Sequence, residues 1–279
     1  MRDRLSFLIA VVVAAPLWAQ GAPSQDEIAE IESFLTTYYR HVVVVSRATS
    51  PTGDTISCVD VNHQPGMNHP LFGPSAVRTE PSLQLKAMLG RVAPAPSSQL
   101  CPTGTVEMKL PTRDQLIAAG SVRSFLQKRP PRRGGPVPAV DGHYYATMRD
   151  YGQLVWGAQS TINVWQPWVN WGDMSLSQIW ISAGGVGSPV QTVEVGWQVL
   201  PSKYGTQMPV IFVYWTADGY SGTGCYNVDC PGFIQTSNAL PVGQSVTPST
   251  DYGPQVEGTV AWYKDPSTRD WVLFVQNQD

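Results

Sequence analysis

One carboxylate in the sequence has neighbours that suit it for chemistry. The run Thr192-Val-Glu-Val-Gly-Trp-Gln-Val199 alternates with period two, and successive side chains of a β-strand point to opposite faces. Glu194, Gly196 and Gln198 would then share a polar face, with the apolar residues on the other. Glycine inside a strand often marks the close approach of another backbone. We interpret Glu194 as the floor of a groove in which Gly196 leaves room for a substrate. The alternative is an acidic position that simply faces solvent.

The strand that would position Glu194 belongs to a β-rich second half. Nine of the ten tryptophans fall at or after Trp156, and no helical period follows residue 140. The stretches with a strand-like pattern are 153–165, 178–182, 192–200, 209–216, 259–263 and 271–275. Short strands separated by glycine-containing turns are typical of an all-β domain. The sequence therefore predicts a mainly β fold, an antiparallel, jelly-roll-like β-sandwich.

The first half reads as a smaller mixed α/β region. Ser24 with Glu27, and Thr112 with Gln115, form capping boxes that predict the starts of two helices. The elements expected from these boxes and from short β-branched runs are helices over about 25–40 and 113–119, a buried strand over 42–45, and a strand over 106–110.

Two segments look like signals for export and processing. Residues 1–22 join a basic start to a short apolar run and small residues, which is typical of a signal peptide, with a retained membrane anchor as the alternative. Residues 127–138 are rich in Pro, Gly and Arg, and we expect their four basic side chains to be exposed. This segment is either a processing site or an ordinary linker. The expected organisation is a signal peptide (1–22), an N-terminal pro-region (23–126), a linker (127–138) and a β-sandwich domain (139–279).

Composition restricts the compartment and the partners. A net charge of -3 with only 14% charged residues gives no reason to expect nucleic-acid binding. No later segment is long and apolar enough to span a membrane, so we expect a secreted or periplasmic protein. Four cysteines in an exported chain favour two disulfides. Cys225 and Cys230 would close a tight loop, which leaves Cys58 and Cys101 to pair. The histidines lack ligand spacing, so we expect neither a metal nor another cofactor.

Six blocks of the sequence resemble the neprosin family, and they occur in the family's order. They are Cys58-Val-Asp-Val-Asn-His-Gln-Pro-Gly-Met-Asn-His-Pro-Leu71, Cys101-Pro-Thr-Gly-Thr-Val106, Ser177-Gln-Ile-Trp-Ile181, Val193-Glu-Val-Gly-Trp-Gln-Val199, Tyr214-Trp-Thr-Ala-Asp-Gly-Tyr220 and Thr223-Gly-Cys-Tyr-Asn-Val-Asp-Cys-Pro-Gly-Phe-Ile-Gln235. The resemblance implies an exported glutamic endopeptidase that cuts polypeptides near proline. It also implies a β-sandwich preceded by an inhibitory N-terminal region.

The chemistry implied by this resemblance uses two glutamates that face each other across a groove. Two close carboxylates do not both ionise easily, so one serves as acid and the other as base. Glu194 matches the first glutamate of the family. The family's second glutamate lies in a Trp-Gly-Gly-Glu-like block, which these 279 residues do not contain, and we expect the family's last strands to be absent with it. The residues expected to line the groove or to serve as an oxyanion or water-positioning group are Gln178, Gly196, Gln198, Tyr214 and Trp215.

Two hypotheses for function follow from these features. The first is a neprosin-like endopeptidase exported as a zymogen. The second is a secreted, non-catalytic β-sandwich module that binds peptide or glycan. Exposed edge strands would also favour self-association. We expect His143 to be structural and Asp218 to be a turn residue, and we expect most tryptophans to lie in the core and not on a sugar-binding face.

Overall fold

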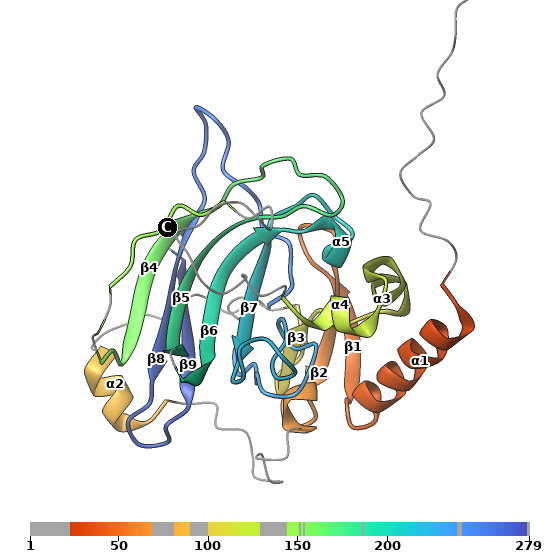
Figure 1. Cartoon of the computed structure of the whole chain (residues 1–279), viewed down its shortest axis with the longest axis horizontal. Helices are drawn as coiled ribbons and strands as arrows, with labels where there is room; N and C mark the ends of the chain where they lie inside the picture. The colour runs from red at the N-terminus through yellow and green to blue at the C-terminus, as the bar shows by residue number, and fades with distance from the viewer. Residues whose placement is uncertain are drawn as a thin grey trace, which may run out of the picture.

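The protein is built mainly from antiparallel β-sheets. The computed structural model describes residues 23–68, 81–89, 100–128, 144–150, 152, 154–185, 187–238 and 242–277 (Figure 1). The predicted signal peptide, most of the predicted linker and His143 lie outside these residues. The described strands form three three-stranded sheets, with orders β1-β2-β3, β4-β8-β9 and β5-β6-β7. The predicted mainly β fold class is confirmed.

The N-terminal region combines helices with the first sheet. Its elements are α1 (Gln25–Tyr39), β1 (Val44–Thr49), β2 (Thr55–Asp60), the 3-10 helix η1 (Pro65–Asn68), α2 (Leu83–Leu89), β3 (Thr105–Met108), α3 (Arg113–Ala119) and α4 (Val122–Leu126). Both predicted capping boxes are present, at Ser24 and Thr112. The prediction of a buried strand over 42–45 is wrong. The strand begins at Val44, and its residues alternate between half-buried and exposed positions; Val45 points to the exposed face and is 55% exposed.

The second half supplies the other two sheets. Its elements are β4 (Gly157–Asn163), β5 (Ser175–Gly185), β6 (Ser188–Val199), α5 (Pro201–Tyr204), β7 (Val210–Thr216), β8 (Glu257–Lys264) and β9 (Trp271–Asn277). Each of the six stretches predicted as strands overlaps one of these strands. The one helix among the described residues of this half, α5, is a single turn too short to produce a helical period.

The two sheets of the second half pack face to face as a sandwich (Figure 1). Val195 of β6 and Val213 of β7 lie in one core cluster with Val260 and Trp262 of β8. The N-terminal region adds residues such as Met108 to this same cluster, so its apolar surface is continuous with the sandwich. The apolar face predicted for β6 is therefore the inward face, which leaves the face of Glu194 on the outer side of the sandwich.

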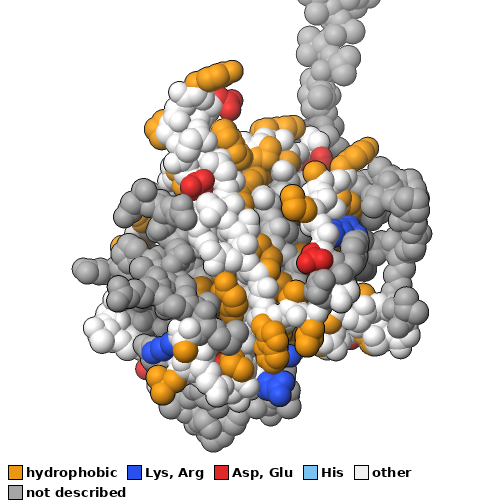
Figure 2. All heavy atoms as spheres, turned by 90° about the vertical axis from the view of Figure 1, so that its left-hand side faces the viewer, with side chains coloured by type: hydrophobic (Ala, Val, Ile, Leu, Met, Phe, Trp, Pro, Cys, Tyr) orange, Lys and Arg blue, Asp and Glu red, His pale blue; other side chains and the backbone are white. Residues whose placement is uncertain are grey.

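Both predicted disulfides are present, Cys58–Cys101 and Cys225–Cys230. Of the nine described tryptophans, two are buried, four are half-buried and three are exposed. Trp197 and Trp262 are buried in the core, whereas Trp168 is 75% exposed. Figure 2 shows the hydrophobic side chains of one face in separate groups among polar and backbone atoms. Within the described residues, every helix is too short or too polar to cross a bilayer.

Candidate active site

Glu194 stands in the middle of the β5-β6-β7 sheet. Its strand partners are Trp180 of β5 and Tyr214 of β7. Residues directly paired across antiparallel strands share a face, so these three side chains form one row. The next row along the strands consists of Gln178, Gly196 and Phe212. The structure thus brings together, on one face, most of the residues expected to form the groove.

Trp215 is the exception, because it does not reach this face. It pairs with Val193, one residue away from the row of Glu194, and therefore points to the opposite side of the sheet. Its ring instead lies against the backbone of Gly232, where an added Cβ would come within 2.5 Å of the indole. Because side chains alternate along β7, the same rule that places Tyr214 on the face of Glu194 places Trp215 on the other face.

Gly196 is needed for a different reason from the one expected. A Cβ at this position would lie 2.0 Å from the backbone oxygen of Ser177 and 2.7 Å from Cα of Gln178. The glycine thus allows the close approach of strand β5. The structure places protein backbone, and not open groove, beside the missing side chain.

One oxygen of the Glu194 carboxylate is held by two hydroxyl groups. Oε1 accepts hydrogen bonds from Thr192 Oγ1 at 3.0 Å and from Tyr220 Oη at 2.9 Å, and the residue is fully buried. Burial, followed by the nearby charge of Glu194, raises the pKa of Tyr220. The phenol therefore stays protonated and remains a donor. Sequence analysis missed both hydroxyls, although alternation places Thr192 on the face of Glu194.

The other carboxylate oxygen is paired with a lysine from the N-terminal region. Lys128 Nζ forms an ion pair with Oε2 of Glu194 and donates to Oε1 of Gln178 at 3.2 Å. Its side chain is only 10% exposed, so the expectation that all basic residues of 127–138 are exposed is wrong for this one. The ammonium also faces three aromatic rings, with centroids at 5.4, 5.7 and 5.9 Å: Phe212, Trp180 and Tyr214.

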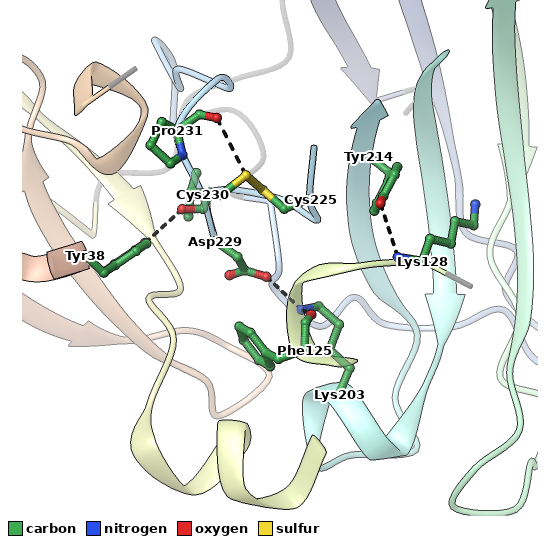
Figure 3. Close-up of a disulfide and its surroundings, with 10 residues drawn as sticks. Tyr38, Phe125, Lys128, Lys203, Tyr214, Cys225, Asp229, Cys230 and Pro231 are labelled. Carbon is green, nitrogen blue, oxygen red and sulfur yellow. Dashed lines mark hydrogen bonds and ion pairs between the residues drawn. A yellow bond between two sulfur atoms is a disulfide. The ribbon is translucent and has the colours of Figure 1, made fainter. Parts of the chain in front are cut away.

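The backbone of the segment that ends at Lys128 is fixed to the second half through residues 125, 126 and 128. The Phe125 carbonyl accepts from Lys203 Nζ at 2.7 Å, and the Leu126 carbonyl accepts from the Tyr226 amide at 3.3 Å. The Lys128 amide donates to Tyr214 Oη at 3.2 Å (Figure 3). We call residues 125–128 the blocking segment. It consists of the last two residues of α4 and the two that follow, and it places Lys128 on the face of Glu194.

A buried ion pair supports the start of the blocking segment. Lys203 Nζ lies 2.7 Å from Asp229 Oδ2, with side chains 6% and 5% exposed (Figure 3). Burial lowers the pKa of Lys203 and raises that of Asp229, while the attraction between the two charges opposes both shifts. The ammonium also faces the Phe125 ring, with 3.6 Å to the centroid. Lys203 thus joins the sandwich to the N-terminal region.

Two further residues serve structural roles. Asp218 accepts from the amides of Gly222 and Thr223 at 2.9 and 3.0 Å, as expected of a turn residue. Burial acts to raise the pKa of Asp218, but hydrogen bonds outweigh it, and the pKa lies below its usual value. Gln198 is fully buried and donates to Tyr204 Oη at 2.7 Å, so its amide supports α5.

Two family models match the chain. The model described as Neprosin matches residues 172–279, and the model described as Neprosin activation peptide matches residues 47–149. Glu194 falls within the first match and Lys128 within the second. The ion pair between them therefore links the two matched regions.

Proposed function

The chain belongs to the neprosin family, and on this premise we propose that it is a secreted glutamic endopeptidase made as a zymogen. In this proposal Glu194 is the catalytic base, and the blocking segment holds it inactive. The N-terminal region then acts as the pro-region. The two disulfides support an oxidising, extracellular compartment.

The base chemistry uses the carboxylate oxygen that the hydroxyls leave free. Thr192 and Tyr220 both donate to Oε1 of Glu194, so Oε2 is the oxygen directed toward the blocking segment. The ammonium of Lys128 occupies the position that an attacking water would take. After the segment leaves, a water at Oε2 can transfer its proton to the carboxylate as it attacks the peptide carbonyl.

Gln178 is the group best placed to assist the attack. Its side-chain oxygen accepts from the same ammonium that pairs with Glu194, so the amide lies beside the position of the attacking water. A neutral amide there can orient the water through its oxygen or stabilise the developing oxyanion through its N–H groups.

The substrate is proposed to be a polypeptide in an extended conformation. The main chain of the blocking segment already forms hydrogen bonds to the second half, to Lys203 of α5, to Tyr226 of the loop after β7 and to Tyr214 of β7. A substrate could follow the same path once the segment has gone. The proton that Glu194 takes from the water can then pass to the leaving amine as the peptide bond breaks. In this scheme Glu194 serves as both base and acid, because these 279 residues do not contain the Trp-Gly-Gly-Glu-like block of the second glutamate that the family resemblance implies.

The observation that supports the proposal most strongly is the pairing of Lys128 with Glu194. The test is cleavage of a proline-containing peptide at acidic pH, after maturation at low pH, by the wild type and by Glu194→Gln. We expect cleavage by the wild type and none by the variant. Glu257→Gln, which changes an exposed acid at the start of β8, serves as the matched control and should keep full activity.

A non-catalytic binding module is the competing function. One observation favours it: the described partners of Glu194 are one ammonium and two hydroxyls, with no second carboxylate among them. If neither wild type nor variant cleaves any peptide at acidic pH, the peptidase proposal fails and the binding module is retained.

A further inference from the structure

The side chain of Lys128 fills a site whose walls suit a primary ammonium ion. A carboxylate oxygen and an amide oxygen accept two of its three N–H groups. Three aromatic rings complete the surroundings, an arrangement that attracts cations through the ring faces. We call this site the ammonium cage; its members are Gln178, Trp180, Glu194, Phe212 and Tyr214.

The cage is built entirely from the β5-β6-β7 sheet. Its five members occupy two adjacent rows of this sheet, fixed by strand pairing. None of them comes from the N-terminal region that carries Lys128. The walls therefore do not depend on the lysine being present. A carboxylate set among three aromatic rings is also destabilised when it loses its counter-ion, so the vacated cage favours a replacement cation.

From this geometry we infer that the cage is a binding site for primary alkylammonium ions, including lysine side chains of other polypeptides. A bound cation would take the position of Lys128 Nζ at Oε2 of Glu194. Its binding does not depend on hydrolysis. One consequence does rest on the proposed function: alkylammonium ions would inhibit the matured enzyme by keeping water from the base.

The cage should discriminate between cations by their N–H groups. The carboxylate and the amide oxygen each require a donor, which a quaternary ammonium lacks. A neutral alcohol of the same length fails for the opposite reason, because it brings no charge to the carboxylate or to the rings. We therefore expect n-propylammonium to bind, and its N-trimethylated form and 1-propanol to bind at least tenfold more weakly.

The test restores the removed part of the lysine to the full-length chain. Lys128→Ala deletes the atoms of n-propylammonium, so this ion is added back as its chloride and the melting temperature is followed. We expect a saturable rise in Tm for Lys128→Ala and no rise for the wild type, whose cage is filled. The double variant Lys128→Ala/Glu194→Gln should lose the response. Sodium chloride at equal ionic strength is the control for screening.

Two outcomes would overturn the inference. One is an equal rise in the wild type and in Lys128→Ala; the other is an equal rise with 1-propanol. If Lys128→Ala does not fold alone, the variant is refolded in the presence of n-propylammonium and, separately, of 1-propanol. A higher yield of folded protein with n-propylammonium supports the site, and equal yields reject it. Because Tm is independent of turnover, a cage that binds without peptidase activity would refute only the proposed function.

Discussion

Tyr220, in the loop after β7, donates a hydrogen bond from its phenolic O–H to Oε1 of Glu194 at the centre of β6, with 2.9 Å between the oxygens. The loop presents the tyrosine in a left-handed backbone conformation, with φ of 64°. Its amide donates to Thr216 Oγ1 at 3.0 Å, and its ring stacks on Tyr214. The turn organised by Asp218 therefore sets the orientation of the carboxylate.

Removing this donor should impair catalysis more than folding. In Tyr220→Phe the ring still stacks, but the carboxylate loses one of its two hydroxyl donors. A hydrogen bond to a charged group contributes about 1.5–3 kcal/mol, so we expect kcat to fall roughly tenfold to a hundredfold. Tyr263→Phe, which removes a hydroxyl bonded to Gln159 on the surface, should leave kcat unchanged.

A single methyl group at Gly196 should disrupt the sheet. In Gly196→Ala the new Cβ meets the backbone oxygen of Ser177 at 2.0 Å, and backbone cannot rotate away as a side chain can. Overpacking of this kind costs about 1–3 kcal/mol or more. Gly172→Ala is the matched control, because nothing lies within 4 Å of its added Cβ. In urea unfolding, the midpoint of Gly196→Ala should be lower than that of Gly172→Ala. Equal midpoints would show that β5 can move to accommodate the added methyl group.

The buried and exposed ion pairs should respond very differently to neutralisation. Asp229→Asn leaves the charge of Lys203 buried and without its counter-ion, which costs about 3–5 kcal/mol in comparable sites. Glu32→Gln breaks the pair with Arg113, whose side chains are 53% and 48% exposed, and should cost no more than about 1 kcal/mol. Chemical denaturation compares the two. A small loss of stability for Asp229→Asn would mean that water or the Phe125 ring stabilises the charged ammonium of Lys203 in place of the carboxylate.

Acid should loosen the N-terminal region from the sandwich. Asp54 accepts from the Ser245 amide at 2.8 Å, and Asp265 accepts from the amide and hydroxyl of Ser82 at 3.0 and 2.8 Å. Burial acts to raise the pKa of both carboxyls, but their hydrogen bonds, and for Asp54 the ion pair with Lys109, outweigh it, and both pKa values are lowered. A carboxyl whose pKa is lower in the folded than in the unfolded chain stabilises the fold at any pH above its unfolded-state pKa. This stability is lost as the pH falls through the folded-state pKa.

The window for this effect lies below about pH 5, where carboxyls begin to take up protons. We expect the Tm of the wild type to fall steeply there. The double variant Asp54→Asn/Asp265→Asn should be less stable at neutral pH but should show a shallower fall. Parallel Tm curves for the two proteins would contradict the assignment of these carboxyls.

Local sequence pattern was enough for the strands and for the face of Glu194. Alternation in 192–199 depends on neighbours two residues apart, and burial of one face preserves it. The same rule would have removed Trp215 of β7 from the groove and added Thr192 of β6. In both cases the residues of one motif lie on different faces of the sheet, and alternation within the motif distinguishes them.

Lys128 and Tyr220 could not be located in this way. Lys128 begins a basic, proline-rich stretch, which normally indicates a solvated linker, and its partner Glu194 is 66 residues away. Tyr220 reaches the carboxylate only because its loop folds back beside β7. Such contacts depend on tertiary packing between segments and leave no periodic signal.

The arrangement of the disulfides has a consequence for how the two halves part. Cys58–Cys101 closes within the N-terminal region, and Cys225–Cys230 closes within the second half. No cysteine remains to tie one half to the other. If the chain is cut between Lys128 and β4, as the proposed maturation of a zymogen requires, only non-covalent contacts hold the two pieces together. Separation would then be a reversible dissociation that depends on concentration and acidity, and under the proposed function the released N-terminal piece would inhibit the second half again on rebinding.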